Sequence, residues 1–133
     1  MLKTEVWSVL VANRMKPLQN IETFLKRFNY FRDGEFRSVT IINPTTILVI
    51  LAGQDEALAY DWKSVHIEFS GVVDAKLLAD TQYPLLDMGN GISLIQDNNA
   101  IAFGVDECRT VASIKTSSCY IEATTLKYEE NAF

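Results

Sequence analysis

The sequence contains few of the residues that build disulfide scaffolds and metal centres, since only two of its 133 residues are cysteines and one is a histidine. Cys108 and Cys119 do not form a Cys-x-x-Cys pair and are too few for a disulfide framework, so we expect two free thiols. The single histidine, His66, excludes zinc sites that need two imidazoles. It also leaves a serine triad with only one possible base. We therefore expect no metal and no cofactor.

Long apolar runs and targeting signals are also lacking. The longest uninterrupted apolar run, residues 47–52, is far too short to span a membrane. An N-terminal apolar stretch, residues 6–12, is short for a signal core and lacks a small-x-small cleavage site after it. The one Asn-x-Thr triplet, Asn43-Pro44-Thr45, is disqualified for glycosylation by its proline. These absences predict a single cytoplasmic domain over residues 1–133, with no membrane partner.

Charge of one sign is in excess, because 12 basic residues stand against 17 acidic ones and the formal net charge is −5. This balance argues against a dedicated duplex-DNA binder, whose affinity depends on neutralising phosphates. Residues 1–37 hold seven basic and four acidic groups, or +3, whereas residues 38–133 hold five and 13, or −8. Such asymmetry indicates either a surface for a partner or an internal dipole in which the two parts help to hold each other.

Apolar periodicity predicts one clear helix, from about Asn20 to Phe31. Its apolar stripe consists of Ile21, Phe24, Leu25, Phe28 and Phe31. Asn20 suits the N-cap, and Asp33-Gly34 supplies a stop. Residues 4–14 are compatible with a helix or a strand, and we favour the helix.

From residue 35 the pattern changes to strands and tight turns. The predicted strands are 36–42, 47–52, 64–70, 92–96, 100–105 and 119–128. Turns at Asn43–Thr46 and Asp97–Asn99 predict two hairpins, and residues 74–80 are expected to form a short helix. We therefore predict an α+β fold in which an N-terminal helical segment packs on a mainly antiparallel sheet of about six strands. Residues 1–34 would be mainly helical and residues 35–128 strand-rich.

One candidate polar cluster involves the only histidine. His66 and Glu68 share a face of the predicted strand 64–70, about 7 Å apart, and Asp61 lies just before them. Together they are a candidate metal-binding or acid–base cluster, although a surface His–Glu pair explains the pattern better. His66 could also activate Cys108 or Cys119 as a nucleophile, but no local cysteine motif accompanies either thiol. We therefore assign no catalytic residue.

Two turn sequences fail as ligand motifs. Gly89-Asn90-Gly91 lacks the third glycine of a dinucleotide fingerprint because Leu94 occupies that position. Asp97-Asn98-Asn99 opens like a calcium loop, but Ala102 replaces the required glycine. Both segments are predicted to be turns.

Aromatic residues interleave with basic ones near the predicted helix end, as they do in platforms for single-stranded nucleic acid. The aromatic residues are Phe28, Tyr30 and Phe31, and the basic ones are Lys26, Arg27, Arg32 and Arg37. Because Phe28 and Phe31 belong to the apolar stripe, only Tyr30 is expected to be exposed, which argues against a nucleic-acid partner. Tyr60 and Trp62 are candidate interface anchors, because aromatic residues are enriched in interfaces.

The segment Phe31-Arg32-Asp33-Gly34-Glu35-Phe36, placed between a helix and a long meander of strands, resembles small bacterial families of uncharacterised or toxin-immunity type. The resemblance is one of element order over residues 20–128, with few residues in common. Those families often carry a His-Asp pair at the junction of helix and strand, and here Arg32 stands in place of the histidine beside Asp33. Arg32 and Asp33, at this junction, are further candidate interface residues.

These observations leave three functional hypotheses. The first is a non-enzymatic protein-interaction domain, such as an immunity-type inhibitor, that covers a protein partner with an acidic sheet surface. The second is a small-molecule-binding protein or enzyme with a pocket around His66, Glu68 and Asp61. The third is a homo-oligomeric structural protein. The sequence leaves the oligomeric state open.

Overall fold

A computed structural model describes residues 15–133 of the chain, so the expected helix at residues 4–14 lies outside the described residues. The strands, in chain order, are β1 (Lys16–Pro17), β2 (Glu35–Asn43), β3 (Thr46–Asp55), β4 (Asp61–Ser70), β5 (Asp74–Lys76), β6 (Ile92–Asp97), β7 (Ala100–Val105), β8 (Tyr120–Ala123) and β9 (Thr125–Ala132). The α-helices of this part are α2 (Ile21–Arg27) and α3 (Val111–Ile114), and the 3-10 helices are Asn29–Phe31, Glu56–Leu58 and Asp80–Leu85.

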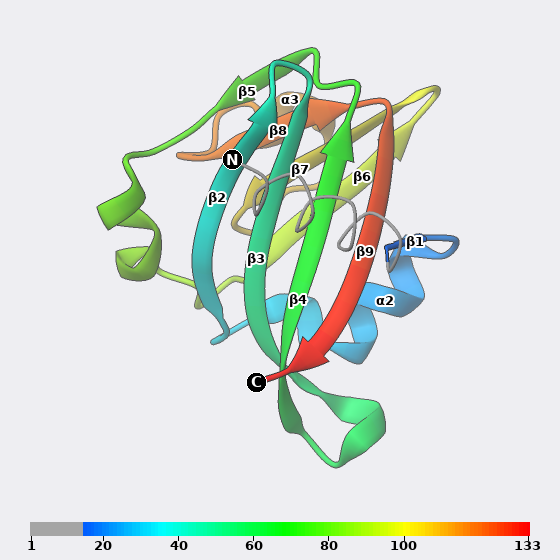
Figure 1. The fold of residues 1–133 in the computed structure, drawn as a ribbon, viewed down its shortest axis with the longest axis vertical. Helices are drawn as coiled ribbons and strands as arrows, with labels where there is room; N and C mark the ends of the chain where they lie inside the picture. Colours follow the sequence, from blue (N-terminus) through cyan, green and yellow to red (C-terminus); the bar gives the residue numbers. More distant parts are fainter. Residues whose placement is uncertain (1–14) are drawn as a thin grey trace, which may run out of the picture.

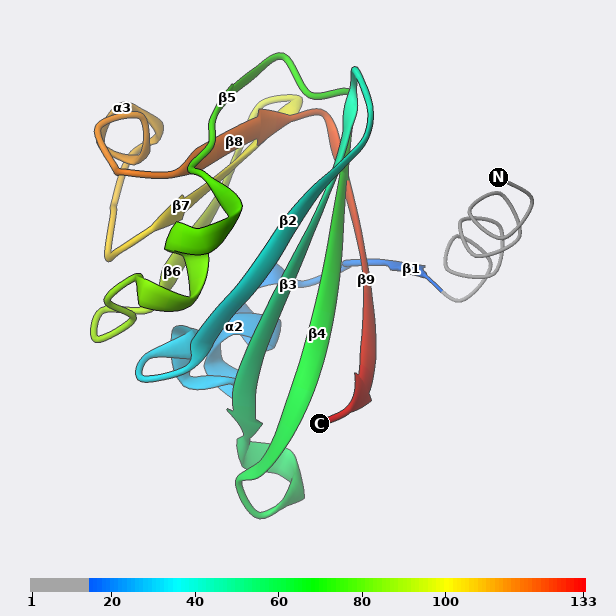
Figure 2. The ribbon, with the colours of Figure 1, turned by 60° about the vertical axis from the view of Figure 1, so that its left-hand side comes forward.

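The strands form two antiparallel sheets rather than the single sheet of about six strands that the sequence suggested. The larger sheet has the order β1-β9-β4-β3-β2, and the smaller one the order β5-β8-β7-β6. Both sheets are visible in Figure 1, and their separation is clearest in Figure 2. The fold is therefore rich in antiparallel sheet and broadly α+β, with few helical residues. None of the helices formed by residues 15–133 is long and apolar enough to cross a membrane.

The larger of two hydrophobic clusters fills the space between the two sheets, and α2 closes it at one end. Alternation along β3 and β4 directs Val49, Val65 and Ile67 inward, where all three are fully buried. The smaller sheet contributes Phe103, and α2, which lies above the β3–β4 hairpin in the lower half of both views, contributes Phe24 to the same core. The helix therefore lies against both sheets through a single apolar stripe.

Helix α2 begins where the sequence predicted and ends earlier. The Asn20 side-chain oxygen accepts a hydrogen bond from the Thr23 amide at 2.9 Å, which makes Asn20 the N-cap. The helix ends at Arg27, and the next residues form the 3-10 helix Asn29–Phe31 instead of another α-helical turn. The predicted helical span 20–31 was therefore too long, although Phe28 and Phe31 are buried as the stripe indicated.

Both predicted hairpins are present, joining β2 to β3 and β6 to β7. The predicted last strand, residues 119–128, was wrong because the chain divides it at Thr124 between the two sheets. At this corner the Thr124 amide donates to the Ser70 carbonyl at 3.1 Å. The next residue, Gly71, has a φ of +67°, and a Cβ there would lie 2.0 Å from the Thr124 hydroxyl oxygen. The corner thus depends on a residue without a side chain.

The expected short helix at residues 74–80 is also absent. Its first part is the edge strand β5, which pairs with β8 and places Asp74 opposite Glu122. A 3-10 helix follows at Asp80–Leu85, where Tyr83 is buried and stacks on Phe36 with ring centroids 4.9 Å apart. Pairing with β8, which is distant in sequence, therefore overrides the local helical pattern.

Candidate functional site

The junction between α2 and β2 contains a turn with unusual backbone geometry. Asn29, Tyr30, Phe31 and Asp33 all have left-handed conformations, with φ values of +52°, +58°, +57° and +59°. For residues other than glycine this conformation costs about 1–2 kcal/mol each, and only asparagine and aspartate adopt it readily. We call residues 29–33 the left-handed turn. Strain of this kind persists only where the surrounding structure holds the backbone in place.

Packing of Phe31 and contact with the loop before β6 hold the left-handed turn. The Phe31 side chain is fully buried and stacks on Phe28 with ring centroids 5.0 Å apart. The Asp33 amide donates to the Met88 carbonyl at 2.7 Å. A Cβ at Gly91 would lie only 2.0 Å from the Tyr30 carbonyl oxygen, so the loop and the turn are in direct backbone contact. These contacts direct Tyr30, Arg32 and Asp33 outward.

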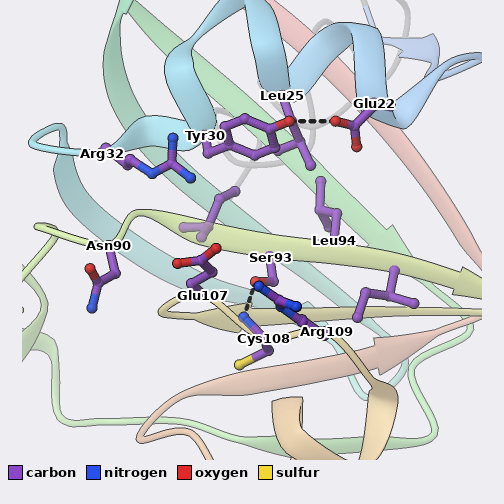
Figure 3. Close-up of a pocket in the computed structure, with 12 residues that line it drawn as sticks. Glu22, Leu25, Tyr30, Arg32, Asn90, Ser93, Leu94, Glu107, Cys108 and Arg109 are labelled. Atoms are coloured by element: carbon purple, nitrogen blue, oxygen red, sulfur yellow. Dashed lines mark hydrogen bonds between the residues drawn. The ribbon is translucent and has the colours of Figure 1, made fainter.

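A hollow of about 290 Å³ lies on one side of the left-handed turn, between α2, β6 and the segment after β7 (Figure 3). We call it the Tyr30 hollow. The Tyr30 hydroxyl donates to Glu22, and this bond raises the pKa of the phenol. The Arg32 guanidinium lies 4.7 Å from the centre of the Tyr30 ring and donates to the Asn29 side-chain oxygen at 3.3 Å. Arg32 is therefore held over Tyr30 by a cation–π contact.

The opposite wall of the Tyr30 hollow carries charges of both signs. Glu107, Cys108 and Arg109 follow β7, and all three line the hollow (Figure 3). The Ser93 hydroxyl ties this segment to β6, because it accepts from the Cys108 amide and donates to the Asp106 carbonyl, both at 2.7 Å. The wall is fixed, but its mixture of carboxylate and guanidinium groups does not favour one ligand class.

A second hollow of about 350 Å³ lies on the other side of the left-handed turn, against the β3–β4 hairpin. It brings together all four candidate interface residues, Arg32, Asp33, Tyr60 and Trp62. We call it the Trp62 hollow. Glu56 is a further charged residue in its wall. Residues that are separated by almost thirty positions in the sequence thus share one concave surface.

Apolar side chains are exposed around this hollow. Tyr60 is 60%, Trp62 37%, Leu58 49% and Phe133 58% exposed. The Trp62 and Phe133 rings lie 5.6 Å apart, and the Arg37 guanidinium sits 4.4 Å from the Phe133 ring centre. The hairpin projects from the lower end of the molecule, close to the C-terminal residue, in both Figure 1 and Figure 2. We call Leu58, Tyr60, Trp62 and Phe133 the end patch.

Four charged side chains anchor the base of this hairpin. Arg27 binds Asp55 through two hydrogen bonds, Nε to Oδ1 and Nη2 to Oδ2, both at 2.9 Å, and it also donates to Glu130. Lys63 lies 3.3 Å from Asp55 Oδ2 and 3.2 Å from Glu130 Oε1. We call these residues the ion cluster. Its two cations and two anions balance, so it contributes no net charge to the Trp62 hollow.

Asp55 is the centre of the ion cluster. It is fully buried, and its Oδ1 also accepts from the Ala57 amide at 3.0 Å, which caps the 3-10 helix Glu56–Leu58. The hydrogen bonds from Arg27, together with those from Lys63 and the Ala57 amide, lower the pKa of Asp55 to about 2. The hydrogen bonds that Arg27 donates to Asp55 in turn raise the pKa of Arg27. Both groups therefore stay charged over the physiological range.

The structure separates Asp61 from the other two members of the predicted polar cluster. His66 and Glu68 share the outer face of β4, opposite Glu129 and Lys127 of β9. Asp61 lies at the start of β4, opposite Asp55, about 16 Å along the strand from His66. None of the three predicted residues lines the Tyr30 or the Trp62 hollow. Within residues 15–133, no three His, Cys, Asp or Glu side chains are grouped so that they could hold a metal ion.

Both cysteines are free thiols in different surroundings. Cys119 is fully buried in the core, and burial raises its pKa to about 11. Cys108 is half-buried beside the Tyr30 hollow. The high pKa and the burial of Cys119 disfavour a nucleophilic role for that thiol.

The comparisons with known proteins add no relative to this picture. No family model matches the chain, and the searches of curated proteins and of solved structures also find no match.

The ion cluster is the feature that the sequence interpretation missed. Its signal was present in β3, where Ile47, Val49 and Leu51 alternate inward and the same alternation continues to Asp55. A carboxylate at an inward position requires charged or hydrogen-bonding partners. The cations that pair with Asp55 come from α2 and β4. Their identity depends on how these two elements pack, so the spacing of residues in the sequence does not predict it.

Proposed function

We propose that this chain is a non-enzymatic protein-interaction domain that binds a protein partner through the end patch and the Trp62 hollow. The observation that carries the proposal is the convergence of exposed apolar side chains at one end of the molecule, around a concave surface. Exposed apolar groups that cluster, rather than occur singly, mark interaction sites. Tryptophan, tyrosine and arginine are also the residues that dominate binding energy in interfaces.

Rigidity of the hairpin supports the same proposal. Ala59 and Tyr60 have left-handed backbone conformations, with φ values of +55° and +64°. The Tyr60 amide donates to the Asp55 carbonyl at 2.9 Å, and the Gln54 side chain donates to the Tyr60 carbonyl at 3.3 Å. These bonds and the ion cluster hold the backbone of the hairpin that carries Tyr60 and Trp62, which lowers the entropy lost on binding.

The resemblance to toxin-immunity-type families suggests the type of partner. An immunity protein acts by covering its partner, and this needs a rigid exposed surface rather than catalytic groups. The junction that carries the resemblance, Arg32 and Asp33, lies in the wall of the Trp62 hollow. On this proposal the domain is an inhibitor that masks a protein partner in a bacterial cytoplasm.

The test is a capture experiment from a lysate of the source organism with matched surface variants. The bait proteins are the wild type, the double variant Y60S/W62S and the control L85S, which alters an 83%-exposed leucine outside the end patch. We expect quantitative mass spectrometry to show one protein retained by the wild type and L85S and lost from Y60S/W62S. Purified candidate and domain should then bind by calorimetry in the same order.

Two outcomes would overturn the proposal. One is that no protein is retained by the wild type above the level of Y60S/W62S. The other is that L85S loses the captured protein to the same extent as Y60S/W62S. Circular dichroism of all three baits checks that the substitutions leave the fold intact.

A further inference from the structure

We infer that the Trp62 hollow receives a cationic side chain, arginine or lysine, from the protein partner. This inference rests on the proposed function and specifies the chemistry of its central contact. It is carried by two carboxylates and two aromatic side chains that face the same hollow, namely Asp33, Glu56, Tyr60 and Trp62.

The two carboxylates are available to a ligand. Asp33 and Glu56 are exposed, and within the described part of the chain neither side chain takes part in a hydrogen bond or an ion pair. They come from different elements, the left-handed turn and the 3-10 helix after β3. A cation placed between them would interact favourably with both.

The cations in the wall of the hollow are already engaged. Arg27 is neutralised within the ion cluster by Asp55 and Glu130. The Arg32 guanidinium lies over Tyr30, in the neighbouring hollow (Figure 3). It also donates a hydrogen bond to the Asn29 side-chain oxygen. Counting the ion cluster as neutral, the remaining charged residues of the wall are Arg32, Asp33 and Glu56, so the hollow has an excess of one negative charge.

Aromatic side chains complete the environment of a guanidinium or ammonium group. The negative faces of tyrosine and tryptophan attract a cation within about 6 Å of the ring centre. The chain itself uses this contact repeatedly, since Arg27, Arg32 and Arg37 each lie within 5 Å of an aromatic ring centre, at 4.7, 4.7 and 4.4 Å. Tyr60 and Trp62 have no such arginine on them among the described residues.

Other side chains fit this hollow less well. An acidic side chain would be repelled by Asp33 and Glu56, and an apolar one would cover their carboxylates without pairing them, which is costly. The volume of about 350 Å³ lies at the small end of the range for ligand sites, which suits one side chain rather than a whole peptide segment. A basic residue at the centre of the partner surface is therefore the occupant that the hollow favours.

The direct test uses N-acetyl-arginine amide as the probe and N-acetyl-citrulline amide, its uncharged isostere, as the control ligand. We expect the probe to shift the Trp62 indole N–H resonance, assigned with W62F, in a saturable manner with a Kd in the millimolar range. The variant D33N/E56Q should bind at least fivefold more weakly. The control D61N, which removes another exposed carboxylate of the same hairpin, should bind as the wild type does.

Three results would overturn the inference. They are the absence of a saturable shift at Trp62 with the arginine probe, equal binding of the citrulline compound, and unchanged binding by D33N/E56Q. Raising the salt concentration from 50 to 500 mM should weaken probe binding, because the Debye length falls several-fold. Binding that is independent of salt would count against a charged contact.

The failure of this inference can be told apart from the failure of the proposed function. If the captured partner is lost by Y60S/W62S but binds D33N/E56Q as tightly as the wild type, the end patch is an interface and the cationic contact is wrong. If Y60S/W62S retains the partner, the proposed function itself is wrong. If both double variants bind the partner more weakly, and L85S and D61N bind it as the wild type does, the result supports the proposed function and the cationic contact.

Discussion

Replacing Asp55 with asparagine removes the anion at the centre of the ion cluster while keeping the shape of the side chain. Asp55 is fully buried, and its folded pKa of about 2 lies well below the value of about 3.9 for an unfolded chain. A difference of about 2 pKa units corresponds to about 2.5 kcal/mol of stability at neutral pH. Removing one partner of a buried pair costs about 3–5 kcal/mol, and the 28% and 23% exposure of the Arg27 and Lys63 side chains relieves part of this. We expect D55N to lower the free energy of unfolding by about 3 kcal/mol at pH 7.

The difference in stability between wild type and D55N should depend on pH in a definite direction. Because the folded pKa of Asp55 is lowered, its contribution is present above the unfolded pKa and is lost as the pH falls toward the folded one. The stability gap between wild type and D55N should therefore be constant from pH 7 to 5 and narrow by about 1 kcal/mol at pH 3.

Urea unfolding followed by far-ultraviolet circular dichroism at pH 7, 5, 4 and 3 measures this gap. The control D61N changes the exposed carboxylate that lies opposite Asp55 in the β3–β4 register, and it should stay within about 0.5 kcal/mol of wild type at pH 7. A D55N protein less than about 1 kcal/mol below wild type at pH 7 would refute the reasoning. So would a gap that stays the same down to pH 3.

Two further predictions concern the left-handed turn and the thiols. G91A should lower the free energy of unfolding by about 3 kcal/mol, because Gly91 has a φ of +68° and its Cβ would meet the Tyr30 carbonyl, whereas G89A should change it by less than about 1 kcal/mol. Equal urea midpoints for G91A and G89A would contradict the close backbone contact. Ellman's reagent at pH 8 should label one thiol of the native protein quickly and two in guanidinium chloride, since Cys108 is half-buried and Cys119 is buried with a raised pKa. C108S should abolish the fast reaction, and fast labelling that persists in C108S would show that Cys119 is accessible.

Local features of the fold could be predicted from the sequence because they depend on neighbouring residues. The start of α2 at the Asn20 cap and the turns of both hairpins are such features. The end of α2 could not be predicted, because an apolar stripe continues through Phe28 and Phe31 although the backbone leaves the helix. What holds the backbone in its left-handed turn is contact with Gly91, about sixty residues later.

The division of the last predicted strand has the same kind of cause. Residues 119–128 keep the character of a strand throughout, and the break at Thr124 arises where this residue meets Ser70 and Gly71 of the other corner. No property of the segment by itself indicates that its two halves belong to different sheets. The number of sheets was therefore mispredicted while the antiparallel character was recovered.

For the candidate site, selection by residue type and selection by closeness in sequence lead to different places in the structure. Tyr60, Trp62, Arg32 and Asp33 were selected because aromatic residues and the junction motif suit an interface, and the structure places all four around one hollow. His66, Glu68 and Asp61 were selected because they are close in sequence along a strand. An extended strand separates such residues by more than 3 Å per position, so nearness in sequence does not bring Asp61 to His66.

The position of β9 in the larger sheet has a consequence for how the chain acquires its structure. β9 lies between β1 and β4, and its Tyr128 is paired with Lys16 of β1. During synthesis, the edge of β4 that pairs with β9 therefore remains unpaired until residues 125–132 have left the ribosome. Contacts of such long sequence separation slow folding, because loop closure is costly before they form. The acidic groups of β9 and the basic end of α2 also meet only at this last step, so the ion cluster closes when the sheet does.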